Sequence, residues 1–364
     1  MVARKVEVLI VGGGVAGLTL AAHLARNGRG EILLLDREDQ AGFYASGHNA
    51  AIGRSLTGRA AHTALAAEGS RTLAAQGLME TSGGRLLGAE PGGLGSLEEE
   101  ARSFGVPVDW RSGAGTPALR ATEHLWIPGD GVVDVHGLLG VLAARARERG
   151  VDLQYRCNLE RLRSSGDGFE VETDLGTVQA SFLANAAGAW AGDLGRRAGG
   201  LPIPLRGLRR HLVWSDIQAV PPGPWSWWVD RPFYLRPESG GTLLCPCDET
   251  AVPLPPRGQQ PATDPSALEQ LHALQEELVP GPDLTVARWW SGLRTFAPDR
   301  GFVVGWDPGN PRLFWMAGLG GHGITTALAV GPLAAEAFRA RTRTGALDPA
   351  RFSGGGTPAS PGLP

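Results

Sequence analysis

One short stretch near the N-terminus constrains the fold more than any other part of the chain. An apolar, β-branch-rich run at 8–11 leads into Gly-Gly-Gly-Val-Ala-Gly, which has the spacing Gly-x-Gly-x-x-Gly and is followed by an apolar helical segment. In this context Gly12 permits a tight turn, Gly14 lets a pyrophosphate approach the backbone, and Gly17 lets the helix pack closely on the strand. The stretch predicts a dinucleotide site, and the alternative is an ordinary glycine-rich β-α turn.

The second predicted strand ends in a carboxylate. Residues 31–35 are mostly apolar, and Asp36 follows the glycines by about 20 residues, the distance at which an acidic side chain holds an adenosine ribose. The helix N-terminus offers its free N–H groups to the phosphates. In this unit we expect the cofactor to contact Gly12, Gly14, Val15, Ala16, Gly17, Asp36 and Arg37.

Length and charge limit the classes of protein to consider. With 364 residues the chain is longer than one ordinary domain, and its net charge of −3 gives no electrostatic reason to expect nucleic acid or an anionic membrane as a partner. Three cysteines without paired spacing argue against a disulfide framework and fit a reducing compartment. Cys245-Pro246-Cys247 is interpreted as strand packing, and no metal site is expected.

The N-terminus superficially imitates a signal peptide. Arg4-Lys5 precedes an apolar run, but Glu7 interrupts the basic part and the glycine fingerprint occupies the apolar core. The apolar run ends at His23, short of the roughly 18 residues that a membrane span requires. We therefore expect no transmembrane segment and a soluble, cytoplasmic protein.

Three further segments of small residues are expected to meet the cofactor. The segment 42–53 reads as a loop along an extended ligand, with a plain surface loop as the alternative; the apolar strand from 182 ends in tiny residues, as where backbone closely approaches a ligand. The turn at 317–326 is a second glycine-rich entry into a helix, which aims N–H groups at an electron-rich ring. The expected contact residues are Ser46, Gly47, Ala50, Ala51, Ala187, Gly188, Trp190, Gly320, Gly321, Gly323 and Ile324.

The remaining patterns predict two domains of different class. Helices are expected at 60–77, 97–104, 136–149, 266–278 (capped by the Ser266 hydroxyl) and 323–339, a hairpin turn at 174–176, a strand at 284–290 and a turn at 291–299. The predicted fold is α/β plus α+β, a discontinuous Rossmann-type domain with an inserted antiparallel substrate domain. The expected division is 1–84, 131–200 and 285–350 for the nucleotide domain, 85–130 and 201–284 for the substrate domain, and a disordered tail at 351–364.

These segments together resemble one flavoprotein family, that of D-amino-acid oxidases, glycine oxidase and sarcosine oxidase. The resemblance is carried by the N-terminal fingerprint and by segments 42–51, 131–134, 185–190 and 320–323, which span nearly the whole chain. Within the family, segments 233–237 and 290–296 look most like bacterial D-arginine dehydrogenase. The resemblance implies FAD, bound noncovalently, with its ring between the two domains.

The resemblance also implies a set of substrate-binding residues. Arg294 matches an arginine that binds the substrate carboxylate, Tyr234 a tyrosine that hydrogen-bonds it, and Arg210 a further arginine of that kind, although Arg209 could serve instead. His322 falls on the loop before the flavin-facing helix, where a packing role is the alternative.

The chain departs from its relatives at three points. Ile52 and Thr57 align where D-arginine dehydrogenase has a histidine and a tyrosine, which counts against a strongly basic substrate. The turn around Gly292 lacks the cysteine that binds flavin covalently in sarcosine oxidase. The sole lysine, Lys5, precedes the first strand, so the lysine that activates oxygen in sarcosine oxidase is missing and a dehydrogenase is favoured.

The resulting hypothesis is an FAD-dependent enzyme that oxidises a D-amino acid, or a similar primary or secondary amine, by hydride transfer to flavin N5. The imino acid then hydrolyses to a 2-oxo acid, and oxygen, a quinone or another acceptor takes the electrons. The alternatives are an N-methyl amine, a glycine-like amine or a 2-hydroxy acid on the same machinery, or a catalytically silent FAD-binding scaffold. The tryptophans at 225, 227, 228 and 290 are assigned to the domain core, with a pocket-lining role as the alternative.

Overall fold

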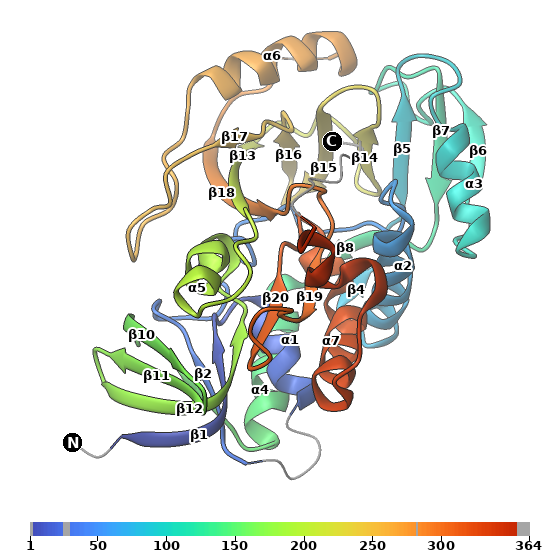
Figure 1. Ribbon diagram of the computed structural model, residues 1–364. Coiled ribbons are helices and arrows are strands. Elements are labelled where there is room, and N and C mark those ends of the chain that lie inside the picture. Colours follow the sequence, from blue (N-terminus) through green and yellow to red (C-terminus); the bar gives the residue numbers. More distant parts are fainter. Residues whose placement is uncertain (1–2, 25–29, 282, 355–364) are drawn as a thin grey trace.

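A computed structural model describes residues 3–24, 30–281 and 283–354 of the chain (Figure 1). Its first sheet has a parallel core in the order β9-β2-β1-β12-β20, and β1 and β12 come from segments far apart in the sequence. An antiparallel hairpin continues the sheet beyond β12, and β19 pairs antiparallel with β20. The strands are β1 (Arg4–Val11), β2 (Ile32–Leu35), β9 (Val151–Gln154), β10 (Leu159–Ser165), β11 (Gly168–Thr173), β12 (Gly176–Asn185), β19 (Val303–Trp306) and β20 (Leu313–Ala317).

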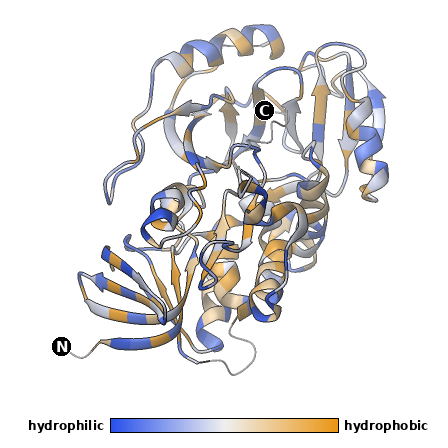
Figure 2. Ribbon diagram, in the orientation of Figure 1, coloured by the Kyte–Doolittle hydropathy of each residue, from blue (hydrophilic) through white to orange (hydrophobic). Residues whose placement is uncertain are grey.

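Alternate residues of β1 serve two different cores. Val8 and Ile10 pack into the cluster shared with the helices on one face of the sheet, whereas Leu9 packs into the cluster on the opposite face with α5. A strand buried on both faces must be apolar throughout, which explains the apolar run before the glycines. Figure 2 shows apolar residues concentrated in these strands and on the adjoining helices. The helices of this part are α1 (Val15–Leu24), α2 (Ala60–Ala75), α4 (Val135–Glu148), α5 (Ala191–Arg197) and α7 (Gly323–Ala340).

The second sheet is antiparallel except where β14 pairs with β5, and it lies above the first in Figure 1. Its order is β17-β13-β16-β15-β14-β5-β7-β6, with β18 on β13. Helices α3 (Gly95–Ser103) and α6 (Ser266–Leu278) contribute to the two cores that cover its faces. The strands are β5 (Gly84–Gly88), β6 (Asp109–Ser112), β7 (Glu123–Ile127), β13 (Arg206–Ser215), β14 (Trp225–Trp228), β15 (Phe233–Glu238), β16 (Gly241–Cys245), β17 (Thr250–Ala251) and β18 (Arg288–Phe296).

A small third sheet joins the two parts, with the antiparallel order β3 (Ile52–Gly53), β8 (Gly131–Val133), β4 (Met79–Glu80). This architecture confirms the predicted fold class, a Rossmann-type layer with an inserted, largely antiparallel sheet. Short 3-10 helices occupy Gly188–Trp190, Gly345–Leu347 and Pro349–Phe352. No helix among the described residues is both long and apolar enough to cross a membrane.

The structure corrects the prediction for residues 284–299. The strand begins at Arg288, and the predicted turn from Ser291 is the second half of β18, which pairs residue by residue with β13. Gly292, which suggested a turn, instead lets β18 lie close to the carbonyl oxygen of His48, 2.7 Å from where a Cβ would stand. The pairing places β18 in the second sheet, although the expected nucleotide domain included residues 285–350. The other domain boundaries stay a prediction.

Two smaller expectations also change. The Ser266 hydroxyl does not cap α6; it donates to the Asp264 carboxylate at 2.8 Å, and this carboxylate also accepts the Ser266 N–H at 3.1 Å. The N-cap residue of α6 is Pro265, and no side chain caps the helix. The tail expected to be disordered begins within the last 3-10 helix, and its residues 355–364 lie outside the described residues. The turn at 174–176 is confirmed, since β11 ends at Thr173 and β12 begins at Gly176.

Candidate active site

The turn between β1 and α1 shows why the fingerprint needs glycine. Gly12 has a φ of +117°, and a Cβ built on it would lie 2.2 Å from the carbonyl oxygen of Ala186. A Cβ on Gly17 would lie 1.9 Å from the carbonyl oxygen of Gly12, so any side chain would force the helix away from the strand. Gly14 lines the cavity in front of the turn, and its bare backbone leaves room there for a phosphate.

Asp36 is held in place by the turn it faces. Its carboxylate accepts the Gly13 N–H at 2.5 Å and the Glu38 N–H at 2.8 Å, and burial raises the pKa of the carboxyl. Beside it, the guanidinium of Arg37 lies 4.0 Å from the ring centroid of Trp190. These side chains form the wall of a cavity at the carboxyl ends of β1 and β2, where a nucleotide is expected in this fold.

Two adjoining cavities contain nearly all of the expected cofactor residues. We call them the Asp36 cavity and the Arg294 cavity after one lining residue of each; Gly14, Ser46, Ala186 and Gly188 line both. The Asp36 cavity is also lined by Gly12, Asp36, Arg37, Ala187 and Trp190. The Arg294 cavity is also lined by Val15, Ala16, Ala50, Ala51, Gly320, Gly321, Gly323 and Ile324. A continuous extended ligand could therefore contact all four small-residue segments.

Two expected contact residues line neither cavity. Gly17 has the packing role described above. Gly47 has a tight-turn role, because a Cβ on it would lie 2.5 Å from the carbonyl oxygen of Gly42. The sequence pattern grouped Gly47 with its neighbours because they are small. Ala45, Ser46, His48 and Asn49 line the Arg294 cavity from this turn, but Gly47 does not.

The Arg294 cavity brings together the four expected substrate-binding residues from four separate elements. Arg294 lies on β18, Tyr234 on β15 and Arg210 on β13, while His322 directly precedes α7. A Cβ on Gly321 would lie 3.1 Å from the Nε of Arg294, so this glycine lets the guanidinium lie against the loop before α7. The arginine thereby stands at the wall formed by the cofactor-facing loop.

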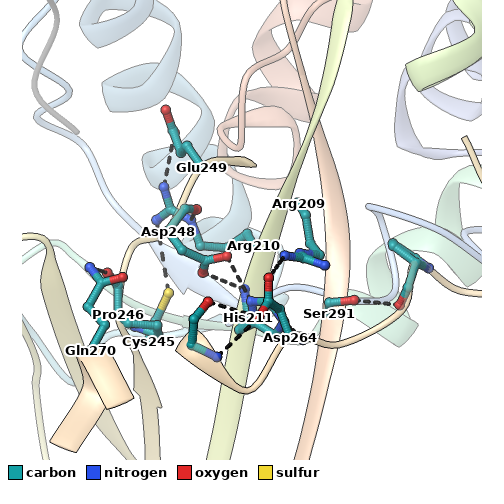
Figure 3. Close-up of polar contacts among 12 residues, drawn as sticks. Arg209, Arg210, His211, Cys245, Pro246, Asp248, Glu249, Asp264, Gln270 and Ser291 are labelled. Carbon is teal, nitrogen blue, oxygen red and sulfur yellow. Dashed lines mark hydrogen bonds and ion pairs between the residues drawn. The ribbon is translucent and has the colours of Figure 1, made fainter. Parts of the chain in front are cut away.

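A carboxylate that the sequence analysis missed engages three arginines of this site. Glu249, just before β17, accepts from Arg294 at 2.6 Å, from Arg210 at 2.9 Å and from Arg300 at 2.6 and 2.8 Å. Figure 3 shows Glu249 above Arg210. The nearby arginines, led by Arg294, hold the pKa of Glu249 below its usual range despite the opposing effect of burial. Glu249 therefore stays ionised and balances part of their charge.

The segment that carries Glu249 is fixed to β13. His211 is fully buried; its Nδ1 lies 2.7 Å from the Asp248 carboxylate, and its Nε2 accepts the Asp264 N–H at 2.9 Å (Figure 3). Arg210 donates to the carbonyl oxygen of Asp248 at 2.8 Å. The His211–Asp248 pair resembles a catalytic dyad, but backbone N–H occupies the nitrogen that would do chemistry, so its role is structural. Arg209 donates to Asp264 at 2.6 Å and does not line the cavity.

Further cavity residues gave no signal in the sequence. Arg54 lies over the ring of Trp227 at 4.4 Å, and that ring stacks on Tyr234 with centroids 4.4 Å apart. Trp227 thus lines the cavity, whereas Trp225 and Trp228 are fully buried in the cores, as expected. Trp227 had been assigned to the core with a pocket-lining role as the alternative, whereas Arg54, Arg59, His62 and Arg300 were missed. No local spacing marks them, because each depends on a different element for its position.

The histidines that line the Arg294 cavity are neutral at pH 7. Burial lowers the pKa of His48, and it lowers that of His62 to about 4. Burial, together with the charges of Arg54 and other neighbours, holds the pKa of His322 well below its usual range. Desolvation disfavours the charged form of imidazole, and nearby cations act in the same direction. The positive charge of the cavity therefore comes from arginine.

Comparisons with known proteins agree with this geometry. The family model for FAD dependent oxidoreductases matches residues 7–337. The chain belongs to this family. It is 28% identical to glycine oxidase of Geobacillus kaustophilus over 96% of the chain and 97% of that protein. The crystal structure of glycine oxidase from the same species superposes with a TM-score of 0.78 at 24% identity, covering 94% of this chain and 96% of that one.

Two other relatives show how widely the fold is shared. The chain is 27% identical to 4-methylaminobutanoate oxidase (formaldehyde-forming) of Paenarthrobacter nicotinovorans over 96% of its own length, but it spans only 46% of that protein. A structure of L-α-glycerophosphate oxidase from Mycoplasma pneumoniae with FAD bound superposes with a TM-score of 0.80 at 16% identity, over 92% of this chain and 95% of that chain. At such low identity the superposition shows the fold alone.

Family membership makes this flavoprotein an FAD-dependent oxidoreductase, as the resemblance implied. The residues of the two cavities fit that cofactor: the glycine turn leaves its backbone bare for a pyrophosphate, and the Asp36 carboxylate stands where a ribose is held. The Arg294 cavity is lined by Gly323 and Ile324 at the start of α7, the helix that the resemblance places in front of the ring. The individual contact residues stay predictions.

Proposed function

We propose that this flavoenzyme oxidises a D-amino acid, or a similar primary or secondary amine, to the imino acid, which then hydrolyses to the 2-oxo acid. The observation that carries the proposal is the position of Arg294, whose guanidinium lies against Gly321 in the loop that leads into α7. A planar guanidinium fork there suits a planar carboxylate attached to the reacting carbon. When bound, FAD supplies a ring that accepts the hydride from that carbon.

The protein contributes binding and orientation. Arg294 binds the carboxylate and the Tyr234 hydroxyl donates a hydrogen bond to the same group; burial raises the pKa of that hydroxyl well above its usual range, so it stays protonated. Arg210 has a supporting role, because its Nε and Nη2 already donate to Asp248 and Glu249. Holding the reacting carbon in one orientation removes much of the entropic barrier. An amine that arrives neutral then needs no protein base.

The names of relatives support an amine as substrate. Glycine, the substrate in the name of glycine oxidase, has a primary amine on the carbon next to its carboxylate. Arg294 and Tyr234 are proposed to bind a carboxylate placed in this way. The D configuration rests on the resemblance of segments 233–237 and 290–296 to D-arginine dehydrogenase. A basic side chain like that of arginine is disfavoured, because five arginines line the cavity and none of its described lining residues is acidic.

A second candidate is an N-methyl amine. The relatives that favour it are 4-methylaminobutanoate oxidase and dimethylglycine dehydrogenase, although the chain spans only 46% and 31% of those longer proteins. The same cavity could orient such an amine through Arg294, since an N-methyl group adds volume but no charge. In that case the oxidised carbon is the methyl carbon and the product after hydrolysis is an aldehyde.

Anaerobic bleaching of the flavin band tests the proposal. The purified holoenzyme is mixed with D- and L-amino acid pairs and with N-methyl amines, and the rate of flavin reduction is measured by absorbance. We expect D-amino acids to reduce the flavin at least tenfold faster than their L partners. Reduction by N-methyl amines alone supports the second candidate, and no reduction by any amine refutes both. Reoxidation of the bleached enzyme by oxygen or by a soluble quinone then identifies the electron acceptor.

A further inference from the structure

The Arg294 cavity is more basic than one substrate carboxylate requires. Arg54, Arg59, Arg210, Arg294 and Arg300 line it, and none of its described lining residues is acidic. Among the described residues, Glu249 is the one carboxylate that forms ion pairs with these arginines, and three of the five share it. Because buried charges need partners, cations left without a carboxylate are suited to an anionic ligand.

Arg54 is the most isolated of these cations. It is 4% exposed, its Nε donates to the carbonyl oxygen of Leu56 at 2.6 Å, and its guanidinium lies over Trp227. Its Nη2 is buried and has no hydrogen-bond partner among the described residues, which also form no ion pair with it. Burial lowers the pKa of Arg54 to about 10, so the group is still charged at pH 7.

The acidic groups closest to Arg54 do not neutralise it by direct contact. Asp130 is fully buried and accepts both the N–H and the hydroxyl of Ser55, and burial raises the pKa of its carboxyl to about 7. Glu100 accepts the Gly58 N–H at 3.0 Å and the Thr63 hydroxyl at 2.9 Å. Both act on Arg54 only at longer range. No acidic side chain of the described residues therefore forms an ion pair with Arg54, although the residue lines the Arg294 cavity.

Arg294 and Arg54 together form two separate binding points in one cavity. Arg294 comes from β18 in the second sheet, whereas Arg54 directly follows β3 in the third. The Nε of Arg294, like the Nη2 of Arg54, is buried without a hydrogen-bond partner among the described residues. Each guanidinium thus keeps one N–H donor that no described residue accepts.

We propose that the substrate is an amino dicarboxylate, with one carboxylate bound by Arg294 and the second bound by Arg54. This assignment rests on the amine oxidation proposed above and names its substrate class. Glu249 offsets the charge of Arg210, Arg294 and Arg300, so that a dianion enters a cavity that still has excess positive charge. Trp227 supports the Arg54 guanidinium from its apolar side by a cation–π contact.

Isosteric substrate pairs test the second carboxylate directly. D-aspartate is compared with D-asparagine and D-glutamate with D-glutamine, because each amide keeps the shape and loses the charge. The readout is kcat/KM for anaerobic flavin reduction. If Arg54 makes a charge-assisted hydrogen bond to the second carboxylate, either D-aspartate or D-glutamate should have a kcat/KM about tenfold to a hundredfold higher than that of its amide. In Arg54→Gln the ratio falls to about threefold or less, while the exposed control Arg161→Gln, with Arg161 on β10, keeps it.

The outcomes separate this inference from the proposed function. Equal rates for acids and amides in the wild-type enzyme overturn the inference and leave amine oxidation standing. Equal losses for acid and amide in Arg54→Gln overturn the role of Arg54 and assign it to the flavin or to the fold. If Arg54→Gln does not fold, the ratio of kcat/KM for acid and amide in the wild-type enzyme still decides whether the enzyme prefers a second carboxylate.

If no amine bleaches the flavin, amine oxidation fails, and ligand binding decides the inference. Succinate and glutarate are titrated into the oxidised holoenzyme, and the shift of the flavin absorbance band gives their dissociation constants. The monoamides of the same acids are the controls. Binding of a diacid at least tenfold tighter than that of its monoamide supports the dicarboxylate site, and equal or absent binding overturns it.

Discussion

Glu249→Gln is the substitution that most directly tests the electrostatics of the cavity. The change keeps the size of the side chain and one acceptor oxygen but removes the negative charge that three arginines share. Arg294, Arg210 and Arg300 approach Glu249 at 2.6, 2.9 and 2.6 Å, and their side chains are 18, 4 and 27% exposed. The variant therefore leaves three clustered cations to repel one another in a partly desolvated site.

The expected loss of stability is moderate. Removing one partner of a buried ion pair costs about 3–5 kcal/mol. The Glu249 side chain is 19% exposed, which screens part of the interaction, and glutamine keeps a hydrogen-bond acceptor. We therefore expect the free energy of unfolding to fall by about 2 kcal/mol, equivalent to a fall of about 0.5–1 M in the urea midpoint.

Urea unfolding of the flavin-saturated enzyme, followed by tryptophan fluorescence, measures this loss. The matched control is Glu99→Gln, because Glu99 is exposed on α3. The pH dependence has a defined sign: the folded-state pKa of Glu249 is lowered, so its contribution is present above the unfolded pKa of about 4.3 and disappears as the pH falls through the folded value. The stability gap between wild type and Glu249→Gln should shrink between pH 5 and pH 3.

Two results would refute this reasoning. One is a Glu249→Gln variant as stable at pH 7 as the Glu99→Gln control, which would mean that the carboxylate does not hold the arginines together. The other is a stability gap that stays constant from pH 7 to pH 3, which would mean that the loss comes from packing or geometry and not from charge.

Three further predictions concern the cofactor and the substrate. Gly17→Ala places a Cβ 1.9 Å from the carbonyl oxygen of Gly12, so the purified variant should carry almost no flavin, whereas Gly140→Ala on α4, with open space around the new Cβ, should keep full flavin content. Asp36→Asn should raise the dissociation constant of FAD by about tenfold to a hundredfold, measured by flavin fluorescence quenching, because one charge-assisted hydrogen bond to the ribose weakens. Arg294→Lys should raise KM at least about tenfold without changing FAD affinity, since a lysine ammonium cannot present two parallel N–H donors to one carboxylate; an unchanged KM would count against Arg294 as the carboxylate anchor.

Local sterics explain why the cofactor half of the protein is readable from sequence. Gly12 has a positive φ, which is a property of its own backbone, and Gly17 must lack a Cβ because of Gly12 within the same turn. The apolar runs around them follow from burial of the parallel strands on both faces. The two-sheet architecture is predicted by a contrast in the sequence: the strands of the parallel sheet contain continuous apolar runs, whereas the second sheet has shorter runs in which apolar and polar residues alternate.

The sequence was less informative where glycine had more than one explanation. Gly292 suggested a turn, but strand pairing with β13 and contact with His48 decide that it lies within β18. Gly47 was grouped with its cofactor-facing neighbours, but it packs against Gly42. For Gly292 the contact that excludes a side chain is distant in sequence, whereas for Gly47 it lies within the same segment 42–53.

The sequence by itself determined a dinucleotide-binding fold and the family resemblance that led to FAD, and it predicted a substrate-binding role for Arg294. Only the tertiary structure brought Glu249 against three arginines and placed Arg54 in the same cavity. Glu249 directly precedes β17, Arg54 directly follows β3, and Arg294 lies on β18, so no short-range spacing in the sequence relates the three residues. Backbone turns are encoded by a few consecutive residues, but the convergence of charged side chains depends on strand register and on how two sheets pack together.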